Sequence, residues 1–324
     1  MALVRAVGGR LVVFGVSLLL ASLLIFVLTH ALPGDPAIKI LGTGADPTAI
    51  AELRHRLGLD RPASVQYLDW LGGFVTGDLG RSYTTNEPVA VLIAPRIGVT
   101  GWLCGISILL APLVALPQGM LAAVKRRNWS GFAASALSQL GLAVPAFYAG
   151  ILLVVVFAVK LHWLPANGYV ELRDATGWWD WPGWAQHLVL PVLSLVLVQA
   201  SVLTRYVRSA FLEVVHEDYF RTARSIGWTQ WRALWRHGLR NVAISVVTVL
   251  GLQLSTMLVG AIVVEQVFRL PGLGTALLQA VSNGDLQVVQ TIVMLLVGFV
   301  LVVNLLTDLV YLVIDPRLRS GGRR

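Results

Sequence analysis

The chain has 324 residues, of which 56% are hydrophobic and only 13% are charged, and its formal net charge is +8. Soluble domains carry roughly a quarter charged residues, so this composition excludes an ordinary water-soluble protein and predicts an all-α protein that crosses a membrane several times. The single cysteine, Cys104, excludes an intrachain disulfide and a cysteine-based metal site.

Six stretches without Asp, Glu, Lys or Arg predict membrane-spanning helices, because each is close to or longer than the ~20 residues that cross ~30 Å of hydrocarbon. They are Leu11–Ala31, Ile97–Val124, Ser130–Val159, Leu188–Thr204, Val242–Val264 and Leu286–Thr307. The fourth is the shortest and contains Pro191. The chain then divides into a first segment with its span (1–31), an outer loop (32–96), a five-helix core (97–314) and a basic tail (315–324).

The outer loop is the one sizeable predicted segment outside the membrane on its side. Pro33-Gly34-Asp35-Pro36 is expected to end the first helix. Asp46-Pro47 and Gly58 mark the start and stop of a short helix at about 48–57, and a second helix is expected at about 62–74. These helices are too small for a core of their own, so we expect them to pack on the membrane part or on a partner.

The distribution of charge predicts the orientation. Sixteen of the 25 Lys and Arg residues and only four acidic residues lie on the side that holds both termini, and twelve acidic residues lie on the other side. Cytoplasmic loops are the positive ones, so both termini are expected in the cytoplasm. The basic residues lie where topology alone places them, which disfavours a nucleic-acid partner. Five tryptophans between the third and fourth spans fit an aromatic belt at the outer surface: Trp163, Trp178, Trp179, Trp181 and Trp184.

The sequence lacks the motifs of an energy source or of catalysis. It contains no G-x-x-x-x-G-K-[ST] phosphate loop, no cluster of metal ligands and no paired catalytic carboxylates. Asp308 is the one acid in a predicted span and is expected to pair with a helix-end cation or the backbone. An ion-coupled transporter or channel and a membrane enzyme are therefore disfavoured alternatives. Uptake that followed a proton gradient would favour the first, and a product formed by the isolated chain the second.

Uncharged polar residues inside the spans have two interpretations. Such groups either bond one helix to another or line a hydrated path, and for any single residue we place the structural role ahead by roughly two to one. Gln253 and Ser255, in a span that also holds Gly251 and Gly260, are the better candidates for a path, with Gln199 as a third.

The segment 205–241 is the most informative part of the chain. It carries seven arginines between two apolar runs: Arg205, Arg208, Arg221, Arg224, Arg232, Arg236 and Arg240. Within it, Asp218 is expected to cap a two-turn helix and Gly227 to end it. Charge alone favours binding to anionic lipid, whereas a short capped helix of small residues favours a groove on a protein.

The predicted helix has a face suited to close contact. Thr222, Ala223 and Ser225 are small, and Arg221 and Arg224 share a face that can pair with acids of a partner. After it, Trp228, Trp231, Trp235 and Leu239 mark one helical stripe and Arg232, Arg236 and Arg240 an adjacent one. This pattern predicts a helix at headgroup level or one that continues into the fifth span.

These residues resemble a known family. Asp218-Tyr-x-Arg-Thr-Ala-Arg-x-x-Gly227, followed by Arg236-His237-x-Leu-Arg-Asn241, is similar to the cytoplasmic "EAA" loop of ABC importer permeases in the variant of the peptide permeases. Further motifs resemble, in order, the B-type permease subunit of dipeptide and oligopeptide importers: Pro33-Gly-Asp-Pro36, Leu57-Gly-Leu-Asp-Arg-Pro62, Gln66-Tyr67, Gly77-Asp-Leu-Gly80, Trp163-Leu-Pro165, Val249-Leu-Gly-Leu-Gln253, Pro271-Gly-Leu-Gly274 and Asp315-Pro-Arg317. Against the general pattern, Arg221 and Thr222 replace the first two positions, His237 the later Ile, and Leu239-Arg240 the Leu-Pro pair, as is typical of the peptide subfamily.

The resemblance implies a type I ABC importer permease in a bacterial or archaeal inner or plasma membrane. It implies a heterodimer with a homologous C-type permease, two ABC ATPase subunits that hold ATP and Mg, and an extracytoplasmic substrate-binding protein. This chain would hold no cofactor and would have no catalytic site. The residues implied to couple to the ATPases are Asp218, Tyr219, Arg221, Thr222, Ala223, Arg224, Ser225, Ile226 and Gly227. The implied substrates are short peptides, with nickel, glutathione or another small solute as alternatives.

Overall fold

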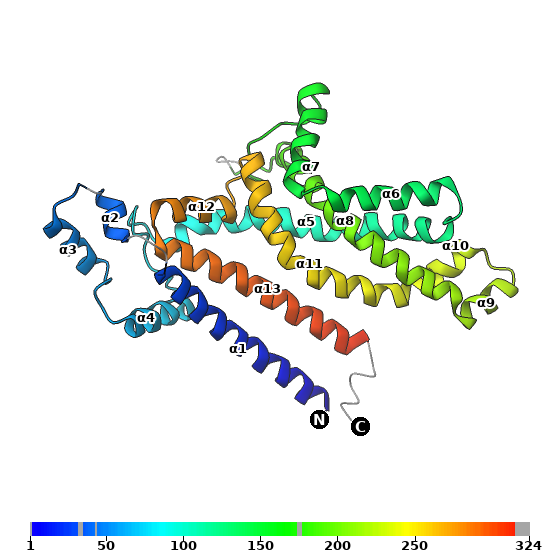
Figure 1. Ribbon diagram of the computed structural model, residues 1–324, viewed down its shortest axis with the longest axis horizontal. Helices are drawn as coiled ribbons and strands as arrows, with labels where there is room; N and C mark the ends of the chain where they lie inside the picture. Colours follow the sequence, from blue (N-terminus) through cyan, green and yellow to red (C-terminus); the bar gives the residue numbers. More distant parts are fainter. Residues whose placement is uncertain (1, 32–34, 43, 174–176, 315–324) are drawn as a thin grey trace. The chain divides into compact units, whose positions relative to one another are not determined.

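The computed structural model describes residues 2–31, 35–42, 44–173 and 177–314, and within them the regular elements are helices (Figure 1). In chain order they are α1 (Ala2–His30), α2 (Pro36–Leu41), α3 (Pro47–Arg56), α4 (Ala63–Thr76), α5 (Val89–Val124), α6 (Trp129–Ala143), α7 (Ala146–Leu153), η1 (Val154–Lys160), α8 (Trp181–His216), α9 (Asp218–Ser225), α10 (Gln230–Ala233), η2 (Leu234–Gly238), α11 (Leu239–Phe268), α12 (Leu273–Asn283) and α13 (Leu286–Ile314). The predicted all-α fold is confirmed. The predicted stop at Pro33-Gly34 and the tail 315–324 lie outside the described residues.

Among the described residues, five helices are long and apolar enough to cross a membrane, namely α1, α5, α8, α11 and α13. The predicted third span, Ser130–Val159, is wrong as one straight helix, because α6 and the α7–η1 segment meet at 108°. The bend falls at Val144, which is extended (φ −99°, ψ 119°), just before Pro145. A residue before proline is disfavoured in the helical region, and proline itself donates no backbone hydrogen bond. Counted as one broken span, the pair brings the number to six.

The predicted fourth span, Leu188–Thr204, is far too short. Helix α8 has 36 residues, about 54 Å, and begins where the Asp180 carboxylate accepts a hydrogen bond from the Gly183 N–H (2.9 Å). Pro191 lies inside it, and Ser194 Oγ donates to the Pro191 carbonyl (2.6 Å). Residues 205–216 form the last turns of α8 rather than a loop. These turns make α8 longer than a bilayer is thick.

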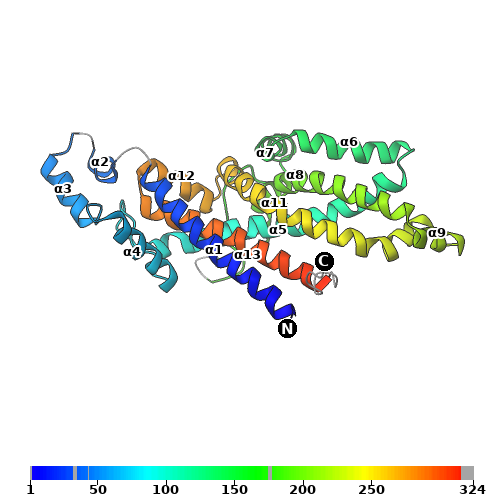
Figure 2. The same ribbon diagram turned by 60° about the horizontal axis from the view of Figure 1, so that its bottom comes forward.

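The chain folds into two compact units, one within residues 1–100 and 271–309 and the other within 101–270. In the first unit, α1 and α13 are antiparallel (Figures 1 and 2). Arg10 Nη1 lies 3.1 Å from Asp308 Oδ1 at one end, and Gln290 Nε2 donates to Thr29 Oγ1 (2.8 Å) at the other. The contacts are 18 or 19 residues apart on each helix, about 27 Å, which is close to the thickness of the hydrocarbon core. Asp308 thus pairs with a cation as predicted, but Arg10 lies in the third turn of α1 rather than at its end.

Helices α3 and α4 of the outer segment occur as predicted, α2 was not predicted, and α4 packs on the membrane helix α1 of the same unit. Asp46 Oδ1 accepts from the Thr48 N–H (2.9 Å) at the start of α3. Trp70 and Tyr67 of α4 pack with Phe26 of α1, and Tyr67 OH lies 2.9 Å from Ser22 Oγ. Helix α4 therefore takes its core from the helix on which it rests.

An element that the sequence did not reveal is the cluster around Asp285, just before α13. Its carboxylate is almost fully buried and accepts from Ser82 Oγ (2.5 Å), Thr84 Oγ1 (3.0 Å) and the Tyr83 N–H (3.1 Å). Burial, with a smaller contribution from Asp285, raises the pKa of the Tyr83 phenol to about 12. The loop before α5 is thus tied to the start of α13 by the hydrogen bonds of one carboxylate.

In the second unit, α8 packs against α6, α7 and α11. Contact between α6 and α8 requires glycine at position 141, because a methyl group there would overlap Ser201 Oγ. Helix α11 extends beyond its predicted end at Val264, so that Glu265 is fully buried inside it. Asp308 is therefore not the one acid in a membrane helix.

Candidate functional site

The helix predicted between Asp218 and Gly227 is present as α9, but its N-cap is Glu217. Glu217 is the single residue between α8 and α9 and is extended (φ −74°, ψ 145°), and its side chain makes no capping hydrogen bond. The predicted capping role of Asp218 is wrong, because α8 continues to His216 and shifts the boundary by one residue. Asp218 is instead the first helical residue, and its carboxylate, 98% exposed, lies 3.7 Å from Arg221 Nη1.

The end of α9 follows the prediction. Gly227 has φ +92°, in the left-handed region that glycine tolerates best. The Trp228 N–H donates to the Ala223 carbonyl (3.2 Å) and the Gly227 N–H to the Arg224 carbonyl (3.1 Å). This is the hydrogen-bond pattern of a Schellman motif. A Cβ at Gly227 would meet nothing within 4 Å, so the backbone conformation alone requires glycine there.

Helix α9 rests on an apolar base. Phe220 and Ala223, three residues apart, are both buried on one face, and α9 contacts α8 and α10. The neighbouring elements also carry fully or nearly fully buried apolar residues: Phe211 and Val214 in α8, Ala233 in α10 and Leu234 in η2. Ala223 was expected on the contact surface, but it packs inside the chain at 5% exposure. Its small side chain therefore serves the packing of α9 within its own chain.

The outer face of α9 carries the remaining predicted residues, which are exposed: Asp218, Tyr219, Arg221, Thr222, Arg224, Ser225 and Ile226. The hydroxyls on this face are satisfied locally, since Thr222 Oγ1 donates to the Asp218 carbonyl (3.0 Å) and Ser225 Oγ to the Thr222 carbonyl (2.8 Å). Arg224 Nη1 donates to the Trp228 carbonyl (2.5 Å) and braces the turn. The face therefore offers an apolar tip, Ile226 at 68% exposure, beside a positive rim.

The helix after the turn continues into α11, as one of the two sequence interpretations predicts. It starts with α10, passes through the π-helical turn η2 and runs on as α11. Trp231 and Trp235 lie on one stripe with ring centroids 6.5 Å apart. Trp228 precedes the helix, so its place on that stripe was wrong; Arg232 lies 4.8 Å from its ring centroid instead. The side chain of Arg240 lies outside the described part of the chain.

Two of the three candidate path residues come together. Gln199 of α8 and Gln253 of α11 line the same narrow gap, which is too small for a water molecule and is otherwise surrounded by apolar side chains. Both amide atoms of Gln253 are buried and, among the described residues, have no hydrogen-bond partner. Ser255 is exposed and does not line the gap. Leaving a buried amide unsatisfied costs about 1–3 kcal/mol, so Gln253 marks a position that this conformation does not optimise.

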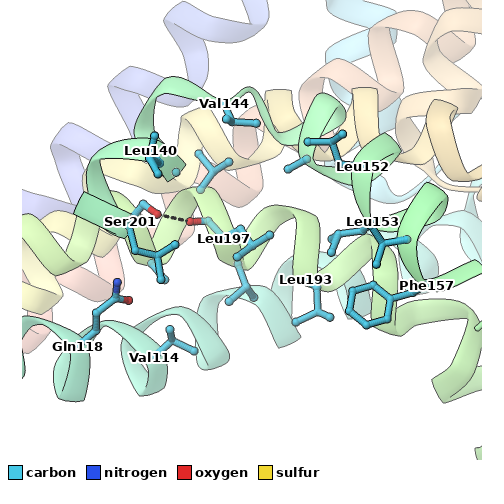
Figure 3. Close-up of a pocket in the computed structure, with 17 residues that line it drawn as sticks. Val114, Gln118, Leu140, Val144, Leu152, Leu153, Phe157, Leu193, Leu197 and Ser201 are labelled. Atoms are coloured by element: carbon cyan, nitrogen blue, oxygen red, sulfur yellow. Dashed lines mark hydrogen bonds between the residues drawn. The ribbon is translucent and has the colours of Figure 1, made fainter. Parts of the chain in front are cut away.

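A second, larger cavity gave no signal in the sequence. It has a volume of about 410 Å³ and lies where α6 breaks from α7, against α5 and α8 (Figure 3). Its walls include Leu140 and Val144 beside the break and Leu197 on α8. The bend at Pro145 creates this space, and the single-span prediction for 130–159 did not anticipate that bend.

The arrangement described so far is a bundle of apolar helices with one small exposed helix on an apolar base. Residues 115–320 match the family described as binding-protein-dependent transport system inner membrane component, and residues 2–104 match its N-terminal component. The chain belongs to this family of membrane permeases. The predicted resemblance to permease subunits is thereby confirmed over nearly the whole length.

Curated relatives of this permease agree. A protein of Brucella abortus (strain 2308) named "Putative peptide transport system permease protein" is 42% identical over 303 residues, covering 93% of this chain and 95% of the relative. A glutathione transport system permease protein of Salmonella choleraesuis (strain SC-B67) is 41% identical over 303 residues, covering 94% and 95%. Among solved structures, inward-facing conformations of the MetNI methionine ABC transporter match with a TM-score of 0.55 at 18% identity, over 71% of this chain and 99% of that one. That likeness establishes the shared fold.

Proposed function

We propose that this permease is a transmembrane subunit of an ATP-driven importer for short peptides. The observation that supports the proposal most is the combination of family and loop: a permease fold in which an exposed helix, α9, stands on a base of its own chain. The chain also lacks a phosphate-binding loop. Energy must then come from another protein, and α9 is the surface best prepared to receive it.

The ATPase contact is proposed on the outer face of α9. Its apolar tip, Ile226, and its positive rim, with Arg221 and Arg224, suit a groove with an apolar floor and acidic edges. Buried Phe220 and Ala223 couple movement of α9 to the end of α8, because an apolar core moves as a packed body. We infer that closure of two ATPase subunits draws two such helices together and switches the permease between inward- and outward-facing forms.

The remaining partners follow from the same proposal. A homologous C-type permease would complete the pathway, two ABC ATPases would bind ATP and Mg on the side of α9, and an extracytoplasmic binding protein would deliver substrate. Both termini are then cytoplasmic. The turn between α5 and α6 supports this orientation, because it holds Lys125, Arg126 and Arg127 and lies at the same end of its unit as α9 (Figures 1 and 2).

Short peptides are the proposed substrates, and glutathione is the second candidate because the Salmonella relative bears its name. Nickel has no support from the relatives described, and no group of three or more metal-binding side chains occurs in the part of the chain that the structure describes. We place Gln199 and Gln253 beside the route, where opening of their gap would let a passing substrate or water satisfy the Gln253 amide.

Co-purification from the native membrane followed by reconstitution tests the proposal. The complex should contain a second permease and two ATPase subunits, and the binding protein loaded with a di- or tripeptide should raise ATP hydrolysis and uptake into liposomes. Stimulation by glutathione but not by ordinary peptides would select the second candidate. Uphill uptake by this chain alone, or uptake driven by a proton gradient without ATP, would refute the proposal.

A further inference from the structure

The cavity at the α6–α7 break is apolar and opens on the surface of the helices. Several residues that line it are themselves substantially exposed: Leu137, Leu140, Leu152, Val156 and Leu197. These residues belong to helices that are parts of membrane spans. The cavity is therefore a groove that is open to the surroundings of the helices.

The two polar side chains that line the groove are occupied within the chain. Gln118 Nε2 donates to the Ala134 carbonyl (3.2 Å), and Ser201 Oγ donates to the Leu197 carbonyl (2.6 Å). A peptide has one donor and one acceptor per residue and would lose its hydrogen bonds to water on entering such a site. The groove thus selects against the transported substrate and suits a hydrocarbon chain.

The size of the groove suits an acyl chain better than a whole partner helix. A helix with side chains is at least about 10 Å wide, so a volume of about 410 Å³ holds only about one helical turn. An acyl chain is much narrower and can use the whole length of the groove.

A basic turn lies next to the groove along two of its helices. Lys125, Arg126 and Arg127, between α5 and α6, are all exposed, and no ion pair joins them to an acid among the described residues. Gln118 in the groove is seven residues before Lys125 on α5, about 10 Å along the helix. Trp129 and Phe132 follow at the start of α6, exposed by 79% and 59% with ring centroids 5.4 Å apart.

We propose that this surface is a binding site for one anionic phospholipid. Its phosphate pairs with the basic turn 125–127, the Trp129–Phe132 pair lies at the headgroup boundary, and one acyl chain occupies the groove. Charge complementarity fixes the headgroup class, because basic residues beside membrane helices attract anionic lipids, and aromatic pairs gather at the interface. The bound chain fills the gap at the broken span and supports the α6–α7 bend.

Photolabelling of the native complex in lipid nanodiscs tests the site. The probes are phosphatidylglycerol and phosphatidylcholine with identical acyl chains that carry a diazirine, and labelled peptides are mapped by mass spectrometry. We expect phosphatidylglycerol to label peptides within 137–157 and 193–201 at least about fivefold more than phosphatidylcholine does. Changing Lys125, Arg126 and Arg127 to Gln should reduce the label from phosphatidylglycerol to the level of phosphatidylcholine.

Two matched variants test the groove itself. Leu197→Trp on α8 fills the groove and should abolish the label from both lipids. Leu109→Trp, which likewise replaces an exposed leucine of a membrane helix, lies on α5 outside the groove and should leave the label unchanged. Equal labelling by both lipids would refute the anionic headgroup. Protection of the groove by a neighbouring subunit, seen as crosslinks to protein instead of lipid, would refute the lipid. Neither result depends on the substrate, so each is separable from failure of the proposed transport function.

Discussion

Two polar regions of the molecule use opposite designs. In the α9 loop the charged and hydroxyl side chains face outward, and the buried part, Phe220 and Ala223, is apolar. Around Asp285 the charge is 2% exposed and receives hydrogen bonds from Ser82, the Tyr83 backbone and Thr84. The α9 loop leaves charged side chains exposed to another molecule, whereas the region around Asp285 pairs its polar groups with one another inside the chain.

The difference separates surfaces for recognition from surfaces for fixation. A buried carboxylate is stable only when its acceptors are filled, and once filled it holds its donors in one geometry. An exposed helix on an apolar base has a fixed shape but keeps its charges for pairing elsewhere. Gln253 resembles the recognition surface of α9, since its buried amide has no partner among the described residues.

The largest effect is expected from Gly227→Glu. Position 227 has φ +92°, where a side chain strains the backbone by about 1–3 kcal/mol, and the new acid lies at the tip of the proposed docking face. Membrane insertion should be unchanged, while ATP-coupled uptake by the reconstituted complex should fall at least about tenfold, a loss of ~1.4 kcal/mol of docking free energy.

Gly77→Glu is the matched control for that variant. Gly77 ends α4 with φ +85° and also has open space around a Cβ, so it carries a similar backbone cost away from α9. It should retain most of the uptake. Equal loss in both variants would show that strain, rather than docking, explains the effect.

The second prediction concerns the fixed region. Asp285→Asn replaces one acceptor oxygen by an amide donor that faces the Ser82 and Thr84 hydroxyls, so donors are left unpaired in a buried site. We expect a loss of about 2–4 kcal/mol of stability and faster proteolysis of the 77–88 loop. Asp78→Asn, an exposed carboxylate that accepts from the Gly80 N–H (3.1 Å), is the control and should cost much less. A wild-type thermal midpoint for Asp285→Asn would contradict the assigned role.

Gln253→Leu tests whether the unsatisfied amide serves transport. Removing both unpaired polar atoms should leave stability unchanged or raise it by about 1 kcal/mol. Peptide uptake should nevertheless fall severalfold if the amide serves the route. Ser255→Ala, outside the gap, should change neither quantity. If the variant is more stable and keeps full uptake, Gln253 has no functional role. This part of the interior would then serve only to hold the helices together, as the region around Asp285 does.

Much of the fold could be predicted because hydrophobic length is a strong signal in a membrane protein. Helix α9 and its terminal glycine were predictable for a similar reason, since caps are local chemistry. The boundary at Glu217 was not, because it depends on how far α8 continues, and α8 is a long helix whose last turns carry arginines. The predicted span ended at Thr204 because charged Arg205 follows, but the helix itself continues to His216.

The features that were missed depend on contacts between distant residues. Ser82 and Asp285 are 203 residues apart, and no periodicity in the sequence brings them together. The inward position of Ala223 likewise depends on packing against α8 and α10. The break at Pro145 had a local signal in the residue before proline, which an uninterrupted apolar stretch outweighed.

The smallest expected effect is a pH dependence at the exposed pair His55–Asp60, next to the end of α3. Their hydrogen bond (2.6 Å) raises the pKa of the His55 imidazole and lowers the pKa of the Asp60 carboxyl. The stability that His55 contributes to the turn is fully present below its usual pKa of about 6.5 and is lost as pH rises through the raised pKa. The stability that Asp60 contributes is fully present above about pH 4 and is lost on acidification. Amide-exchange protection of residues 55–60, corrected for intrinsic rates, should therefore be highest between about pH 4 and 6.5 and decline toward pH 8. In His55→Gln this dependence should disappear, and in His216→Gln it should persist. A decline that survives in His55→Gln would show that another titrating group controls the turn, which would contradict the role assigned to the His55–Asp60 pair.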